Sequence, residues 1–431
     1  MNYYVIILTF ILLNLPHAAQ FSFNSETQKT YPLGVNIPGG GHLDRSKLIC
    51  SNYKHNPSKI EELRIRDGLP NVFYKLNKNQ ALTVAYLGGS ITKAKGWRNE
   101  TFAWLEQEYP RSTFKHINAG ISGTPADFGA MRLKRDILNY NVDLLIIEFR
   151  VNSGGGIGTR AIEGIIRQVW DKNPTTDICL VYTISNWMLS HMVKENTQTH
   201  FGEEMETVAN YYGIPSIDLA PEVIKQLKEG KLEFEAEEPV PGKLHFSVDG
   251  VHPTTQGHKL YTDVINRSLT KMKNKCTPNV HELQAPLVEN HLINAELISI
   301  TNAKTSEGWE VVNMKKDSIY LTYDNGRRSP LVLGKAIKTN QEGTAYTINW
   351  LGTRLTLSSI QQQGMEISVT TDGRTPVFYT YNRTNNQMAA RLTNLNELPN
   401  GKHSTTITVQ KVPKGTWFYA GQYGVLHPPK S

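Results

Sequence analysis

A serine that could act as a nucleophile, Ser90, closely follows the apolar run 82–87. Ser90 stands in residues 86–92 (YLGGSIT), where two glycines permit a tight turn that leaves its hydroxyl uncovered. Such a hydroxyl attacks an acyl carbon only beside a general base, and residues 249–253 (DGVHP) contain a candidate. There Asp249 can accept a hydrogen bond from one ring nitrogen of His252 and leave the other nitrogen free for Ser90. Ser90, Asp249 and His252 are therefore predicted to form a catalytic triad for acyl transfer.

Three hydrogen-bond donors could hold the negative charge that develops on the acyl oxygen during such an attack. They are the backbone N–H of Ser90, the backbone N–H of Gly120 and the side-chain amide of Asn152. Donors of this kind lower a barrier because they are in place before the charge appears. Each follows an expected strand, and the carboxyl ends of parallel strands meet at one edge of a sheet. Taken singly these motifs are ordinary turns, but in this order they favour the catalytic interpretation.

Residues 82–272 alternate between strand-like apolar runs and helical patterns. The expected strands are 83–87, 114–117, 142–149, 178–184 and 214–217, and the expected helices are 97–108, 126–138, 161–170, 203–212 and one that begins after Thr254 or Thr255. The run 142–149 (VDLLIIEF) is apolar almost throughout, as in a parallel strand that is buried on both faces. Alternation with short connections predicts an α/β domain whose parallel sheet is covered by helices on both faces.

The sequence changes character after Cys276. Short alternating runs predict a second, all-β domain, a sandwich, over about residues 290–431. The runs are 318–322, 354–357, 366–370 and 405–409, with hairpin signals at 324–326 (DNG) and 372–373 (DG). Residues 20–80 are polar and irregular and are expected to form a lead-in that could pack against either domain. These changes place the α/β domain at residues 81–276.

The amino-terminal residues 1–19 differ from everything that follows. Residues 5–15 form an apolar run too short to span a bilayer, and small residues precede polar sequence at Gln20. This pattern predicts a signal peptide on residues 1–19 and a secreted or periplasmic protein. No later apolar run is long enough to cross a membrane, so no membrane span is expected. The net charge of +7 is spread along the chain rather than gathered in a basic arm, so no nucleic-acid partner is indicated.

Three cysteines cannot all pair with one another. Cys179 lies in an apolar, strand-like run and is expected to be a buried thiol. Cys50 and Cys276 flank the α/β domain and could either form a disulfide in an oxidising compartment or remain as thiols. The chain contains neither a C-x-x-C pair nor an H-E-x-x-H motif, so no metal site is predicted.

These blocks resemble the SGNH/GDSL hydrolase superfamily over about residues 82–272. The serine block reads GGSIT, Gly120 and Asn152 match the glycine and asparagine blocks, and residues 249–253 match the final D-x-x-H-P block. The resemblance implies a flavodoxin-like three-layer α/β/α fold, ester hydrolysis through an acyl-serine, and no cofactor. Two departures concern residues around the triad. Gly89 stands where the superfamily usually has aspartate, and residues 150–153 read RVNS where it has G-x-N-D.

A second, looser resemblance lies in the carboxyl-terminal half. Residues 348–355, 370–373 and 398–403 are similar to the small jelly-roll domain that accompanies some carbohydrate esterases. Together with the expected export signal, this favours an exported O-acetylesterase whose substrate is an acetylated glycan. Two alternatives remain open at this point. One is a lipase, thioesterase or lysophospholipase on the same triad, and the other is a non-catalytic glycan-binding protein.

Overall fold

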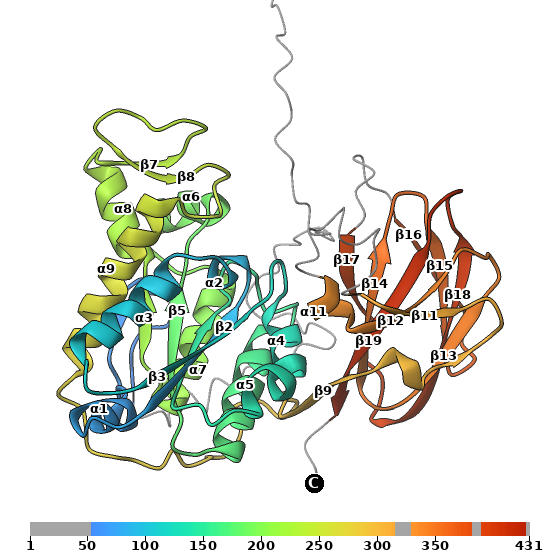
Figure 1. Ribbon diagram of the computed structural model, residues 1–431, viewed down its shortest axis with the longest axis horizontal. Helices are drawn as coiled ribbons and strands as arrows, with labels where there is room; N and C mark the ends of the chain where they lie inside the picture. Colours follow the sequence, from blue (N-terminus) through green and yellow to red (C-terminus); the bar gives the residue numbers. More distant parts are fainter. Residues whose placement is uncertain (1–52, 315–328, 382–388, 428–431) are drawn as a thin grey trace, which may run out of the picture. The chain divides into compact units, whose positions relative to one another are not determined.

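The computed structural model describes residues 53–314, 329–381 and 389–427 (Figure 1). The expected signal peptide, the run 318–322 and the hairpin signal 324–326 lie outside these residues, as does Cys50 with its possible bond to Cys276. Cys179 is a buried free thiol, as expected, and burial raises its pKa to about 12.

A six-stranded sheet forms the centre of the α/β domain, with the strand order β1-β6-β5-β4-β2-β3. Its strands are β1 (Leu63–Arg64), β2 (Leu82–Gly88), β3 (Phe114–Gly120), β4 (Leu144–Glu148), β5 (Asp177–Tyr182) and β6 (Ser216–Asp218). Strands β2 to β6 are parallel, and β1 pairs antiparallel with β6 at one edge. The predicted parallel sheet is confirmed.

Helices cover both faces of this sheet (Figure 1). They are α1 (Pro70–Asn77), α2 (Ser90–Lys93), α3 (Trp97–Glu108), α4 (Ala126–Leu133), α5 (Gly158–Lys172), α6 (Asn186–Glu195), α7 (His200–Tyr212), α8 (Ala220–Lys228) and α9 (Thr255–Met272). Alternate residues of β4 face opposite sides, as the period of a strand requires. Leu145 and Ile147 pack in an apolar cluster with α4, α5 and α7, whereas Leu144 and Ile146 pack in a second cluster with α1, α3 and α9. The three-layer α/β/α arrangement is thereby confirmed.

Several short elements were not predicted. Helices α6 and α8 and the small parallel pair β7 (Leu232–Glu235) and β8 (Leu244–Ser247) lie in stretches that the sequence analysis left unassigned. Of α6 only Met188 and Met192 are buried, so its apolar period is too short to stand out. The predicted helix 126–138 is α4 followed by a π-helical turn, Lys134–Leu138.

The carboxyl-terminal half is a sandwich of two antiparallel sheets, as predicted. One sheet has the order β10-β13-β18-β15-β16, and the other has β11-β12-β19-β14-β17 with β9 beside β19. The strands are β9 (Asn294–Ile298), β10 (Lys304–Thr305), β11 (Glu310–Asn313), β12 (Lys335–Thr339), β13 (Ala345–Gly352), β14 (Arg354–Gln361), β15 (Glu366–Thr371), β16 (Val377–Thr380), β17 (Ala389–Asn394), β18 (Gly401–Lys411) and β19 (Phe418–His427). Asp372 and Gly373, both with positive φ, turn the chain between β15 and β16, so this hairpin is confirmed.

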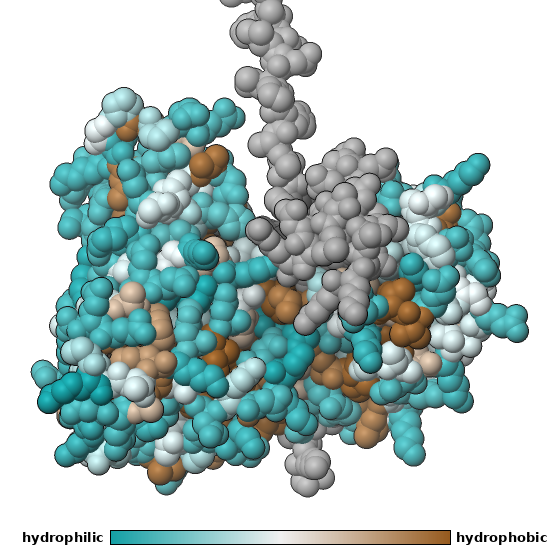
Figure 2. Space-filling model, in the orientation of Figure 1, coloured by the Kyte–Doolittle hydropathy of each residue, from teal (hydrophilic) through white to brown (hydrophobic). Residues whose placement is uncertain are grey.

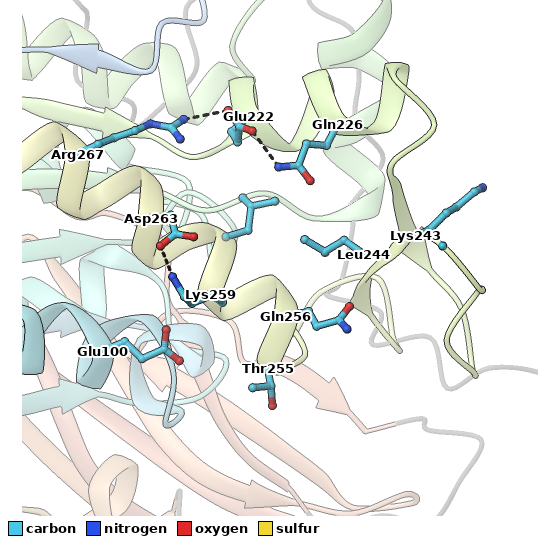
Figure 3. A pocket seen from close by; sticks show the side chains of 12 residues that line it. Glu100, Glu222, Gln226, Lys243, Leu244, Thr255, Gln256, Lys259, Asp263 and Arg267 are labelled. Carbon is cyan, nitrogen blue, oxygen red and sulfur yellow. Dashed lines mark hydrogen bonds and ion pairs between the residues drawn. The ribbon is translucent and has the colours of Figure 1, made fainter.

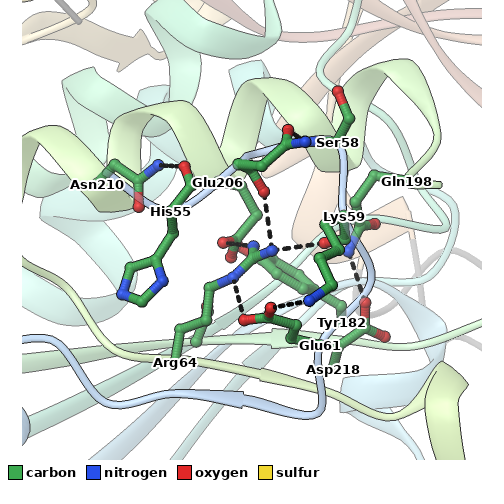
Figure 4. A network of polar contacts seen from close by, with 12 residues as sticks. His55, Ser58, Lys59, Glu61, Arg64, Tyr182, Gln198, Glu206, Asn210 and Asp218 are labelled. Atoms are coloured by element: carbon green, nitrogen blue, oxygen red, sulfur yellow. Dashed lines mark hydrogen bonds and ion pairs between the residues drawn. The ribbon is translucent and has the colours of Figure 1, made fainter. Parts of the chain in front are cut away.

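Residues 53–80 were expected to be irregular, but they belong to the α/β domain. β1 extends its sheet, and Figure 4 shows Arg64 beside the buried Glu206 of α7. Both Arg64 and Arg66 donate hydrogen bonds to Glu206 Oε2, and the Tyr182 hydroxyl donates to Oε1 at 2.7 Å. The expectation failed because arginines in a polar stretch usually point to solvent, whereas Arg64 and Arg66 are 2% and 3% exposed.

We expect Glu206→Gln to lower the free energy of unfolding by about 3–5 kcal/mol, since it removes the buried carboxylate that Arg64 and Arg66 share and leaves Arg64 with Glu61 alone. Burial acts to raise the pKa of Glu206, but Arg66 and Arg64 outweigh it and lower the pKa, so the native side chain is a carboxylate at neutral pH. Urea unfolding measures the loss, with the exposed Glu237→Gln as control. A loss equal to that of the control would contradict this role.

Candidate active site

The three predicted triad residues form one hydrogen-bonded chain. His252 Nδ1 lies 2.7 Å from Asp249 Oδ2, and His252 Nε2 lies 2.8 Å from Ser90 Oγ. Ser90 begins α2 at the carboxyl end of β2, whereas Asp249 and His252 lie between β8 and α9. In such a chain the imidazole can take the serine proton while the carboxylate holds the ring in orientation.

A tight loop between β8 and α9 places the acid and the base. Asp249 Oδ1 accepts hydrogen bonds from the backbone N–H groups of Val251 and His252, at 2.9 and 2.8 Å. Gly250 adopts φ +72°, which favours glycine, and the Ser247 hydroxyl donates to the His252 carbonyl at 2.9 Å. Burial acts to raise the pKa of Asp249, but the hydrogen bonds from His252 and Val251 outweigh it and lower the pKa. Asp249 is therefore a carboxylate at neutral pH.

A buried glutamate that the sequence analysis missed supports the serine turn. Glu148 ends β4 opposite Gly88 of β2 and is fully buried. Its two oxygens accept hydrogen bonds from the hydroxyls of Thr92 and Thr183, each at 2.7 Å. Burial raises the pKa of Glu148, although these hydroxyls partly offset the rise. The carboxyl group thus ties the turn that carries Ser90 to the loop after β5.

Asn152 packs directly against that same turn. A Cβ atom on Gly89 would lie 1.8 Å from Asn152 Oδ1, so the observed conformation requires glycine at position 89. Asn152 is 6% exposed, and its buried Oδ1 has no hydrogen-bond partner. Its Nδ2 makes no hydrogen bond within the described ranges, so the amide N–H groups are available to a ligand. The backbone N–H of Ser90, in the first turn of α2, has no partner within the helix.

The backbone N–H of Gly120, the third predicted donor, is bonded to a neighbouring side chain in this structure. Gly120 is the last residue of β3, and its N–H donates to Asn118 Oδ1 at 3.0 Å. Asparagine side chains readily bond to the backbone two residues ahead, and here that bond occupies the predicted donor. Asn118 also donates to the Lys93 carbonyl at 3.2 Å, which ties the end of β3 to α2. Gly120 as an oxyanion donor therefore stays a prediction, which requires its N–H to leave Asn118 or to be shared with it.

Arg150, where the superfamily has glycine, turns away from Ser90 into a buried cluster. It forms a two-pronged ion pair with Asp218, at 2.7 and 2.8 Å, and donates to the Thr183 carbonyl at 2.9 Å. Gln198 completes the cluster by accepting from Arg150 and donating to Asp218. Arg150, the residue that departs from the superfamily pattern, thus joins the loops that follow β4 and β5 to the end of β6 through buried contacts.

The loop that follows Asn152 packs against Asp127, whose carboxylate also contacts the sandwich. Gly155, with φ +68°, approaches Asp127 of α4 so closely that a Cβ atom would lie 2.2 Å from its Oδ2. The same oxygen accepts a hydrogen bond from Asn394 of β17 at 3.3 Å. The backbone N–H of Ala126 donates to the Ser153 carbonyl at 3.0 Å. The loop is thereby supported by α4 and, through Asp127, by the sandwich.

The hydrogen-bonded triad lies at an open surface. The side chains of Asp249 and His252 are 52% and 46% exposed, and hydrophilic residues cover most of the face seen in Figure 2. A groove of about 730 Å³ lies elsewhere, along α8, α9 and β8 (Figure 3). Charged residues in its lining pair with one another, as Lys259 does with Asp263 and Arg267 with Glu222. Because none of the triad residues lines this groove, it is not the candidate site.

Residues 53–314, 329–381 and 389–427 contain neither a metal-binding cluster nor a membrane-spanning helix. No group of three or more His, Cys, Asp or Glu side chains there could hold a metal ion. None of the helices in these ranges combines the length and the apolar composition that crossing a membrane requires.

Comparison with known proteins shows which proteins the two domains are similar to. Residues 86–260 match the GDSL-like Lipase/Acylhydrolase family. The resemblance inferred from the sequence is confirmed for this domain. Two crystal structures of a two-domain esterase active on acetylated mannans, one with mannopentaose, are similar across both domains. Each esterase chain is 20% identical to this chain, and the match covers 86% of this chain and 100% of the esterase chain. The TM-score is 0.68 for the structure with mannopentaose and 0.67 for the other. Among curated proteins none matches the chain.

We expect Glu148→Gln to lower kcat for p-nitrophenyl acetate by about tenfold or more, since small displacements of a nucleophile are costly. The amide keeps one acceptor oxygen, so either Thr92 or Thr183 must turn its hydroxyl to accept from the amide N–H instead of donating. Steady-state kinetics gives kcat, and far-ultraviolet circular dichroism monitors the fold.

Glu163→Gln is the matched control for that variant. Glu163 is equally buried and accepts from the Tyr212 hydroxyl and from the backbone N–H groups of Leu287 and Val288, which lie outside the triad. If both variants lost kcat alike, the effect of Glu148 would be one of general stability.

Proposed function

We propose that this protein is a serine esterase that removes O-acetyl groups from a carbohydrate. The observation that carries the proposal is the position of His252, bonded to both Ser90 Oγ and Asp249 Oδ2. The family match over residues 86–260 supports hydrolysis of an ester bond.

The proposed reaction begins when Ser90 Oγ attacks the acetyl carbonyl carbon and its proton passes to His252 Nε2. The N–H of Ser90 and the Asn152 amide donate to the oxygen that gains negative charge. The tetrahedral intermediate expels the sugar oxygen, which takes the proton from His252. Water then attacks the acetyl-serine and gives a proton to His252, which passes it to Ser90 Oγ as the acetyl–Oγ bond breaks and acetate leaves. Asp249 stays ionised throughout and stabilises the imidazolium form of His252.

Two observations support a carbohydrate substrate over a lipid. The similar two-domain esterase is active on acetylated mannans, and the match extends across both domains. The triad is exposed rather than set at the bottom of an apolar cleft, and an open hydrophilic setting suits a hydrated polymer better than an acyl chain.

Export through a signal peptide on residues 1–19, followed by release into the periplasm or medium, completes the proposal. It is supported by the apolar run 5–15 and the small residues before Gln20. Determining the amino terminus of the protein recovered from its native cell decides this point.

Ser90→Ala should abolish ester hydrolysis and leave the fold intact, because the hydroxyl lies on a half-exposed turn. Hydrolysis of p-nitrophenyl acetate and the thermal unfolding midpoint are measured together. Activity within tenfold of the native protein would mean that another group is the nucleophile.

Asn152→Ala should lower kcat by about a hundredfold, the scale expected for the loss of one oxyanion donor. KM should change little, because the donor acts mainly on the transition state. A near-normal kcat would remove Asn152 from the mechanism while leaving the triad in place.

Turnover should fall steeply as the acyl chain of a p-nitrophenyl ester lengthens from acetyl to octanoyl. The side chains of Asp249 and His252 are about half exposed, so a long chain bound beside them would bury little apolar surface. Faster turnover of the octanoyl ester would favour the lipase alternative.

A further inference from the structure

One aromatic side chain beside the triad loop is left uncovered. All seven tryptophans of the chain lie in the described residues, and only Trp187 is exposed, with 56% of its surface accessible. Indole rings bury large apolar areas in protein cores and interfaces, so an uncovered one is a natural binding surface.

Trp187 is not needed to hold its helix in place. α6 is anchored by Met188 and Met192, which are buried in the apolar cluster on its side of the sheet. Leu189 and Val193 pack against the same cluster, whereas Trp187 does not. Its ring therefore contributes little to the apolar core.

The backbone brings Trp187 next to the triad loop. The N–H of Asn186, the first residue of α6, donates to the carbonyl of Gly250 at 2.8 Å. Gly250 lies between Asp249 and His252. Trp187 therefore directly follows, in the chain, a residue that is hydrogen-bonded to the triad loop. Val248 of the same loop is also exposed.

Polar groups lie at the residue that precedes the indole on α6 and at the end of β7. Asn186 Nδ2 donates to Glu235 Oε2 at 2.7 Å. The other two oxygens, Asn186 Oδ1 and Glu235 Oε1, accept no hydrogen bond from the residues that the structure describes. A ligand that extended along the start of α6 could meet both the exposed ring and these two acceptors.

A pyranose ring fits this combination, because it presents C–H groups on one face and hydroxyl donors at its rim. We propose that Trp187, Asn186 and Glu235 form a sugar subsite that holds a residue of the glycan beside the acetylated one. The indole stacks on the ring, and the two oxygens accept hydrogen bonds from its hydroxyls. This inference rests on the proposed esterase function and adds residues that select an oligosaccharide over a simple ester.

The test compares two substrates in the full-length protein. Trp187→Ala should lower kcat/KM for chemically acetylated mannopentaose about tenfold, the scale seen when stacking aromatic groups are removed from binding sites. For p-nitrophenyl acetate, which has no sugar to stack, kcat/KM should stay within about twofold. Trp187→Phe should restore much of the loss, and the exposed Phe378→Ala of β16 is the matched control.

A binding measurement separates this proposal from the esterase proposal. Unmodified mannopentaose should quench the tryptophan fluorescence of the Ser90→Ala protein and should not quench that of Ser90→Ala/Trp187→Ala. Quenching in both variants, or equal losses on both esters, would overturn the subsite. If the native protein hydrolysed neither ester, the esterase proposal would fail, and the fluorescence result alone would decide whether the sugar subsite stands.

Discussion

The arrangement of the site depends on one buried carboxyl group, that of Glu148, at the carboxyl edge of the sheet. Loops that leave neighbouring parallel strands have no reason to hold a fixed distance unless a shared group joins them. Glu148 does this by accepting from Thr92 on one side and Thr183 on the other. Hydrogen bonds to a buried carboxyl group are strong, and leaving either donor unpaired would be costly. The absence of a side chain at Gly88 is part of the same arrangement, because a Cβ there would lie 2.3 Å from Thr92 Oγ1.

The triad combines residues that are close together in the sequence with one that is far away. Asp249 and His252 are three residues apart, and their own loop sets their distance through backbone hydrogen bonds. Ser90 comes from 162 residues away, so only the sheet and its covering helices can bring it to His252. Arg150 and Asp218 brace the same edge from inside. A buried ion pair adds little net stability, but it tolerates few alternative arrangements of the loops around it.

Features that depend on local patterning could be predicted from the sequence. The helix 97–108 and the hairpin at 372–373 follow from residues close together in the chain, as does the loop from Asp249 to His252. The run 142–149 indicated a buried strand because both of its faces are apolar. What could not be predicted involves distant partners. The Gly120 N–H is occupied by Asn118, and Arg64 is buried only because Glu206, 142 residues away, receives it. Glu148 gave one usable signal, a carboxylate at the end of an apolar strand, but its partners come from two other segments.

The contact between Asp127 and Asn394 bears on how such proteins can be recombined. Asp127 is buried, and burial raises its pKa, while Arg354 and hydrogen bonds from Phe128 and Asn394 lower it. Two of these compensating residues, Arg354 and Asn394, belong to the sandwich. A gene fusion that kept the α/β domain but attached a foreign sandwich would preserve every triad residue. It would still leave this carboxyl group without matching partners, directly beneath the loop that follows Asn152. We therefore expect productive exchanges between relatives to carry both halves together.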